Sequence, residues 1–77
     1  MKVKILAFGK ITDIISRPEW ELSDVESVGA VRKHLETEFP ALRNLRYLIA
    51  VDKKIANDDD PLQENSVVAL LPPFSGG

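Results

Sequence analysis

The feature of this sequence that most constrains its fold is an apolar run near the carboxyl end, stopped by two prolines. Residues 66–71 read Ser-Val-Val-Ala-Leu-Leu, a composition typical of a buried strand. Pro72 and Pro73 follow directly. A proline offers no N–H to a neighbouring strand and holds φ at about −65°. The run therefore predicts a strand that ends at Leu71 and a stiffened segment after it.

The segment after this strand ends in two glycines. Gly76 and Gly77 have no Cβ, so they place the final carboxylate on the slimmest backbone that a protein can make. At about 3.3 Å per residue, residues 72–77 could extend about 20 Å from a domain formed by residues 1–71. Such an arm would fit the narrow active site of another protein. A frayed end without chemistry is the alternative, and the tail residues alone leave both interpretations open.

Size and composition exclude several classes of function. A chain of 77 residues buries only about 60–65% of its unfolded surface, which leaves little room for an enclosed cofactor pocket. A complete enzyme is therefore not expected. The absence of cysteine excludes disulfides, thiolate metal sites and a cysteine nucleophile. Acyl or sulfur chemistry would have to use the terminal carboxylate.

Charge and hydropathy bear on partners and location. The formal net charge is −2 and there is no basic stripe, so no nucleic-acid partner is expected. No apolar stretch approaches the roughly 18 residues of a membrane-spanning helix, and no signal peptide precedes the first expected strand. We therefore expect a cytoplasmic protein with no membrane partner.

The rest of the pattern alternates strands with helices. Periodicity predicts strands over residues 2–8, 19–23, 46–51, 55–56 and 66–71, a short helix near 11–15 and a long helix over 28–39. Ser27 is a suitable N-cap for the long helix, and Pro40 ends it. Several strands with one long helix predict an α+β roll, in which the helix covers one face of the sheet.

The opposite face of that sheet is expected to carry an apolar patch. Residues 3, 5 and 7 should face the helix, which places Leu6 and Phe8 on the other side. The same alternation places Ala69 and Leu71 there. If the first and last strands are neighbours, these four residues form a docking surface beside the root of the tail, since such patches usually mark partner surfaces. The alternative is that loops cover them.

Other candidate sites lack the pattern that their chemistry needs. Gly9-Lys10 has neither the first glycine nor the Ser or Thr of a phosphate-binding loop. His34 is the only histidine and reads as a solvated helix residue. The acidic residues 58–60 lack the spacing of a calcium loop, and Ser75 has no partner base. We therefore predict no cofactor-binding residue and no metal ligand in this chain.

Together these features resemble a known family. The chain is similar to the small, sulfur-carrier subunits of molybdopterin synthase, which have a β-grasp (ubiquitin-like) fold. The resemblance is carried by residues 3–8, 27–32, 50–52, 60–62 and, most specifically because of the double proline, 68–77. Two departures are Asp52, where the family often has asparagine, and Asn65, where a turn glycine is common. Asparagine tolerates φ > 0, so the turn should persist.

The resemblance implies a mixed sheet of about five strands and a carrier that is not catalytic on its own. A separate ubiquitin-activating-type enzyme would adenylate Gly77 with ATP and Mg²⁺, and a sulfur donor protein would complete its conversion to a thiocarboxylate. Pro72, Pro73, Phe74 and Ser75 would position the tail, and Gly76 would give it clearance.

The loaded tail would then enter the large subunit of the synthase and donate sulfur to cyclic pyranopterin monophosphate. By family analogy, the complex would be a heterotetramer of two small and two large subunits. Three alternatives stay open: a sulfur carrier for thiazole or cysteine synthesis, a ubiquitin-like modifier conjugated through Gly77, and an interaction module with an inert tail.

Overall fold

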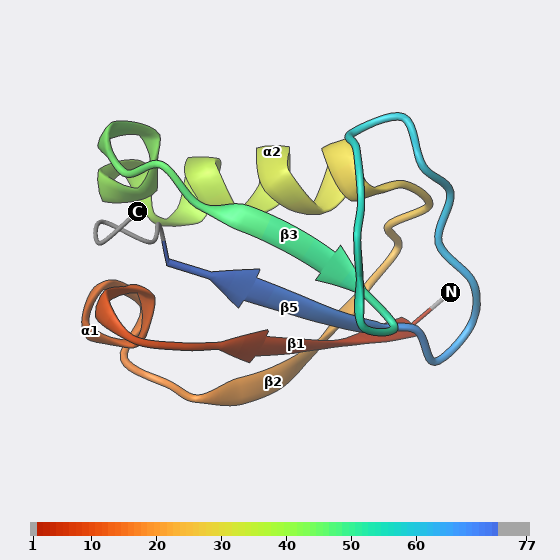
Figure 1. Ribbon diagram of the computed structural model, residues 1–77, viewed down its shortest axis with the longest axis horizontal. Coiled ribbons are helices and arrows are strands. Elements are labelled where there is room, and N and C mark those ends of the chain that lie inside the picture. Colours follow the sequence, from red (N-terminus) through yellow and green to blue (C-terminus); the bar gives the residue numbers. More distant parts are fainter. Residues whose placement is uncertain (1, 73–77) are drawn as a thin grey trace.

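The computed structural model describes residues 2–72. The sites predicted at Pro73, Phe74, Ser75, Gly76 and Gly77 lie outside the described residues. In chain order, the elements in Figure 1 are β1 (Lys2–Ala7), α1 (Lys10–Ile15), β2 (Glu19–Ser23), α2 (Val28–Glu38), the 3-10 helix η1 (Pro40–Asn44), β3 (Leu48–Val51), β4 (Lys54–Ile55) and β5 (Val67–Leu71).

The strands form one mixed sheet of five, in the order β2-β1-β5-β3-β4. Figure 1 shows β2, β1, β5 and β3 side by side in this order. The first and last strands pair in parallel at its centre, and the other neighbouring strands are antiparallel. The condition on which the expected apolar patch depends, that the first and last strands are neighbours, is therefore met. Because the two strands are parallel, their carboxyl ends lie at the same end of the sheet. The turn into α1 and the root of the tail thus meet there.

The long helix α2 packs across one face of this sheet. The Ser27 Oγ accepts a hydrogen bond of 3.2 Å from the Ala30 N–H, which caps the helix as expected. Val28, Val31 and Leu35 are completely buried. Within residues 2–72, no helix combines the length and apolarity that crossing a membrane requires.

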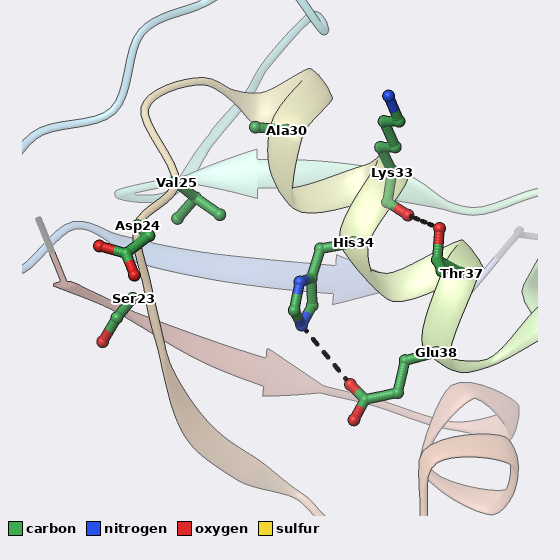
Figure 2. A pocket seen from close by; sticks show the side chains of 8 residues that line it. All are labelled: Ser23, Asp24, Val25, Ala30, Lys33, His34, Thr37 and Glu38. Atoms are coloured by element: carbon green, nitrogen blue, oxygen red, sulfur yellow. Dashed lines mark hydrogen bonds and ion pairs between the residues drawn. The ribbon is translucent and has the colours of Figure 1, made fainter.

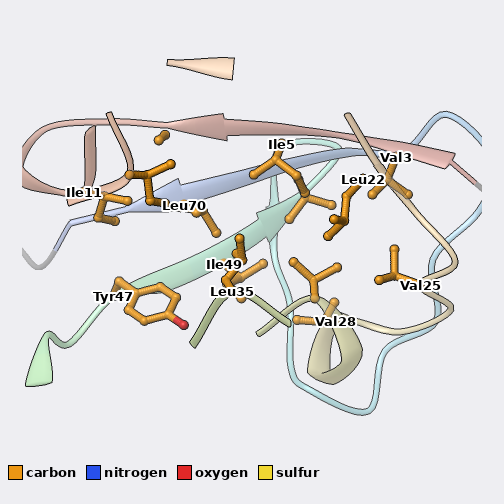
Figure 3. Packing of buried hydrophobic residues seen from close by; sticks show 14 of the residues in the cluster. Val3, Ile5, Ile11, Leu22, Val25, Val28, Leu35, Tyr47, Ile49 and Leu70 are labelled. Atoms are coloured by element: carbon orange, nitrogen blue, oxygen red, sulfur yellow. The ribbon is translucent and has the colours of Figure 1, made fainter. Parts of the chain in front are cut away.

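The core lies between α2 and the sheet (Figure 3). Alternate residues of the two central strands point into it, among them Ile5 and Leu70, which are completely buried. Burying one such side chain stabilises the fold by about 1.5–3 kcal/mol relative to leaving it exposed. The predicted helix-facing alternation of β1 and β5 is confirmed, and it determines what the opposite face displays.

The connection between α2 and β3 differs from the expectation. Residues 40–44, for which no helix or strand was predicted, wind into η1, with Pro40 at its start and Leu42 completely buried. The third strand was expected from residue 46 and begins at Leu48 instead. The reason is that the partner strand ends there: Leu48 pairs with Leu71, the last residue of β5, so residues 46 and 47 have no strand residue opposite them, although the Tyr47 side chain still packs in the core at 7% exposure.

The hairpin between β3 and β4 turns through Asp52 and Lys53, with φ of 49° and 76°. Two consecutive positive values are typical of a two-residue type I′ turn. Lys54 therefore belongs to β4, one residue earlier than predicted.

A separate turn before β5 contains Asn65, which has φ of 66°. The expectation that this turn persists without glycine is confirmed.

Candidate functional site at the root of the tail

The root of the tail lies against the turn that follows β1. β5 ends at Leu71, as the prolines predict, and Pro72 is half-buried. A Cβ added to Gly9 would lie 3.0 Å from the Pro72 Cγ. The structure therefore places the predicted first tail residue in direct contact with a glycine from the other end of the chain.

The sheet face opposite α2 presents apolar side chains beside this root. In the sheet register, Leu6 pairs with Ala69, Ala69 with Ala50, and Ala50 with Ile55. One pleat further toward the tail, Leu71 pairs with Leu48, and Phe8 follows the end of β1. We call this surface the open-face patch, and it consists of Leu6, Phe8, Leu48, Ala50, Ile55, Ala69 and Leu71.

The largest side chains of the open-face patch are accessible. Phe8 and Leu48 are each 45% exposed, and Ile55 is 60% exposed. Leu6, Ala69 and Leu71 are half-buried. Within the part of the chain that the structure describes, loops therefore leave Phe8, Leu48 and Ile55 accessible, whereas Ala50 in the middle of the patch is buried, at 6% exposure. Whether the patch docks a partner stays a prediction.

Sequence reasoning identified Leu6, Phe8, Ala69 and Leu71 but missed the contribution of β3 and β4. Leu48 alternates with the buried Ile49 in β3, which is a signal that it faces away from the core. That signal does not reveal which residues lie beside it. The pairing of β3 with β5 supplies this information, and it joins Leu48 and Ile55 to the same surface.

Charged residues bound the patch on the side of β2. The Lys2 Nζ lies 3.6 Å from the Glu21 Oε1, and the Lys4 Nζ lies 3.3 Å from the Glu19 Oε2. These pairs bridge β1 and β2 and are about half exposed, so each contributes only a little stability. They limit the apolar surface to β1, β5, β3 and β4.

A concave surface lies on the other side of the sheet from the open-face patch, between the end of β2 and α2 (Figure 2). In it, the His34 Nε2 lies 3.7 Å from the Glu38 Oε1, and the Thr37 hydroxyl donates to the Lys33 carbonyl over 2.8 Å. Both interactions are local pairs along one helix. Within residues 2–72, no three His, Asp or Glu side chains are grouped to hold a metal ion.

The acidic residues 58–60 cap α2. The Asp58 and Asp60 carbonyl oxygens accept hydrogen bonds from the Gly29 and Val28 N–H groups, at 2.8 and 3.0 Å. The Asp58 Oδ1 also accepts from the Arg32 Nε at 2.8 Å. Partial burial acts to lower the pKa of Arg32, but the hydrogen bond to Asp58 and the charges nearby outweigh it and raise that pKa. This turn is thus occupied in holding the helix.

Comparison with known proteins identifies the relatives of this chain. The family model described as ThiS matches residues 5–77. The chain is 29% identical over 80 residues to the molybdopterin synthase sulfur carrier subunit of Escherichia coli K12, covering 97% of this chain and 99% of that protein.

Solved structures show the same fold. A putative molybdopterin converting factor subunit 1 from Pyrococcus furiosus superposes with a TM-score of 0.86 at 20% identity, covering 95% of this chain and 98% of that one. SAMP1 from Haloferax volcanii gives 0.83 at 18% identity, with complete coverage of both. A complex of subunits 1 and 2 of the molybdopterin-converting factor from Helicobacter pylori gives 0.74 at 26% identity, with 100% coverage of both chains. The expected β-grasp fold is confirmed.

Proposed function

Because the chain belongs to the ThiS family, we propose that it is the sulfur carrier of a molybdopterin synthase. The likeness to the E. coli carrier subunit covers nearly the whole length of both proteins. The structural observation that carries the proposal is the position of Pro72. It leaves the sheet between the Gly9 turn and the open-face patch, so a protein docked on the patch receives the tail beside it.

The chemistry assigned to the tail follows from the poor reactivity of a carboxylate. A resonance-stabilised carboxylate anion does not donate its acyl group, so a ubiquitin-activating-type enzyme first adenylates Gly77 with ATP and Mg²⁺. A sulfur donor protein then supplies sulfide-level sulfur that forms a bond to the acyl carbon, and AMP leaves with the activated oxygen. The resulting thiocarboxylate is a soft nucleophile that transfers sulfur to cyclic pyranopterin monophosphate.

The carrier contributes no catalytic group to these steps in this proposal. Of residues 2–72, Gly9 packs against Pro72 and has no side chain of its own. Nucleotide, Mg²⁺ and pterin are held by the partner enzymes, and the chain itself binds no cofactor. Its part is to dock, to present Gly77, and to leave after transfer.

The large synthase subunit is the main partner in this proposal. The complex of subunits 1 and 2 from H. pylori includes a chain 26% identical to this one along its full length. We assign docking to the open-face patch and insertion to Pro72, Pro73, Phe74, Ser75 and Gly76. A heterotetramer of two small and two large subunits is the assembly expected.

Intact mass spectrometry tests the chemistry directly. The chain is incubated with its activating enzyme, ATP, Mg²⁺ and a sulfur donor. The expected product is heavier by the difference between a sulfur and an oxygen atom, and tandem mass spectrometry places this change on Gly77. A chain that lacks Gly77 is the matched control and should stay unchanged. No mass change in the full chain, with an enzyme that loads another carrier, would refute the proposal.

The alternative functions differ from this one in the fate of the loaded chain. A carrier for thiazole or cysteine synthesis would form the thiocarboxylate but would not support molybdopterin formation in an extract depleted of its own carrier. A modifier would form stable adducts with lysines of other proteins, and these would disappear when Gly77 is removed. The likeness to SAMP1 lies at 18% identity and concerns the fold alone.

A further inference from the structure

We propose that Gly9 is a positioning residue. Because it has no side chain, the Pro72 ring packs directly against it, and this contact sets the direction in which the tail leaves the domain. The consequence for sulfur transfer rests on the proposed function, because only a tail that enters another protein needs a defined direction. The contact itself does not depend on that function. In the sequence, Gly9 directly follows the first predicted strand and is part of a failed phosphate-binding pattern.

The backbone of Gly9 requires a residue without a side chain. Its φ is 58° and its ψ is −135°, values close to those of the first central residue in a type II′ turn, where glycine is preferred. The Ile11 N–H closes this turn by donating to the Phe8 carbonyl over 3.2 Å. The Thr12 N–H donates to the Gly9 carbonyl over 3.0 Å, which starts α1.

The space above Gly9 is occupied by the proline ring. An added Cβ would lie 3.0 Å from the Pro72 Cγ, 3.5 Å from its Cβ and 3.8 Å from its Cδ. The ring has little freedom to yield, because proline fixes φ and the preceding Leu71 is held in the sheet opposite Leu48. A methyl group at position 9 therefore moves the tail root itself.

The chain offers a matched control for such a substitution. A Cβ added to Gly29 would lie 3.1 Å from the Asp58 carbonyl oxygen, a contact that is almost as tight. That contact is at the start of α2, where the acidic turn caps the helix. Gly29→Ala thus introduces a comparable crowding away from Pro72.

The first experiment measures the direction of the tail without any enzyme. The chain has no cysteine, so Ser75→Cys provides a single position for a nitroxide spin label. Paramagnetic relaxation enhancement then maps the label against the amides of residues 2–72. We expect Gly9→Ala to change this profile and Gly29→Ala to leave it as in the parent. An unchanged profile in a folded Gly9→Ala variant would overturn the proposal.

The second experiment measures the consequence for transfer. This experiment uses chains without the Ser75→Cys substitution. Each chain is made as a fusion joined through a thioester at Gly77, and sulfide cleaves the thioester to leave a terminal thiocarboxylate. The activating enzyme is therefore not needed. Single-turnover sulfur transfer is then followed with saturating large subunit. Misplacing a reacting group by about 1 Å costs up to about 100-fold, and we expect Gly9→Ala to lower the transfer rate about tenfold. The dissociation constant for the large subunit should change by less than the transfer rate, because Leu48, Ala69 and Leu71 of the open-face patch are held in the sheet and stay in place.

A double-mutant cycle separates the contact from backbone strain. Pro72→Ala removes the Cγ and Cδ atoms that the new methyl group would meet, whereas the strain at Gly9 is the same in both backgrounds. We expect Gly9→Ala to cost less than about threefold when combined with Pro72→Ala, against about tenfold with Pro72 intact. Equal costs in both backgrounds, or an equal loss in Gly29→Ala, would show that the effect is strain or general destabilisation and would refute the proposal.

Failure of this proposal is distinguishable from failure of the proposed function. If the parent thiocarboxylate transfers no sulfur, the proposed function is wrong, and the relaxation profile still decides whether Gly9 directs the tail. If Gly9→Ala does not fold, Pro72→Ala tests the same contact, because it changes the other residue that forms it. It should change the relaxation profile, and a parent profile in this variant would overturn the proposal.

Discussion

At the scale of single residues, Tyr47 shows how a buried polar group is accommodated in a small core. Its side chain is 7% exposed, and its hydroxyl donates to the Glu36 Oε2 over 2.8 Å. The Arg32 guanidinium lies 4.9 Å from the centre of its ring. Burial, followed by the hydrogen bond and the charge of Glu36, raises the pKa of Tyr47 above its ordinary value of 10.0.

This raised pKa predicts a loss of stability in alkaline solution. The unfolded chain releases the Tyr47 proton at a lower pH than the folded chain, so the free energy of unfolding should fall as the pH rises above 10.0. The chain has a single tyrosine, so tyrosinate absorbance reports this group alone. We expect the folded protein to titrate well above the denatured one.

Tyr47→Phe is the control for this titration. It removes the hydroxyl and its hydrogen bond to Glu36, at a cost of about 1 kcal/mol near neutral pH. It should also remove the part of the alkaline destabilisation that comes from Tyr47. Equal slopes of stability against pH in both proteins would contradict the assignment of that part to Tyr47.

At the scale of elements, the hairpin of β3 and β4 is tied to β5 through Asp52. The Asp52 Oδ1 accepts a hydrogen bond from the Val67 N–H over 3.0 Å, and the Asp52 N–H donates to the Val67 carbonyl over 2.9 Å. One turn residue thus fixes where β5 begins. Through β5, it also fixes the register that places Leu71 and Pro72.

Substitutions at Asp52 should separate the hydrogen bond from the charge. Asp52→Asn keeps an acceptor oxygen and suits positive φ, so the free energy of unfolding should change by less than about 0.5 kcal/mol. Asp52→Ala loses the acceptor and strains the turn, at a cost of about 1–3 kcal/mol. Urea denaturation measures both. Equal losses in the two variants would show that the carboxylate charge matters more than the bond.

At the scale of the whole molecule, the two faces of the sheet have different roles. One face is buried by α2 and supplies the core. The other carries the open-face patch, whose largest side chains stay accessible. Exposing three large apolar residues does not stabilise a monomer, and the position of Leu48 opposite Leu71, directly before the tail root, favours a partner surface.

Leu48→Ser tests this surface at a residue that the sequence alone did not identify. Leu48 is 45% exposed, so the fold should tolerate the change, while affinity for the large subunit should fall about tenfold, as for a central interface residue. Lys33→Ser, on the exposed side of α2, is the matched control and should bind normally. Calorimetric titration measures both. Normal binding by a folded Leu48→Ser variant would exclude Leu48 from the interface.

Local patterns in the sequence predicted most of the fold. Alternation identified β1 and β5, helical spacing with Ser27 identified α2, and the prolines identified where β5 ends. These signals work because each depends on neighbours within one turn or one pleat. They failed at η1, where Leu42 packs into the core, and at the start of β3, where the partner strand β5 ends opposite Leu48.

The sequence by itself determined which segments become strands and helices, which side of each strand is apolar, and that the chain after Leu71 cannot continue the sheet. Only the tertiary structure decided which strands lie side by side. That arrangement brings Leu48 and Ile55 to the open-face patch and packs Pro72 against Gly9. The physical reason is that periodicity is a property of adjacent residues. Contacts between distant segments depend on strand order and register, which the packing of the whole molecule selects.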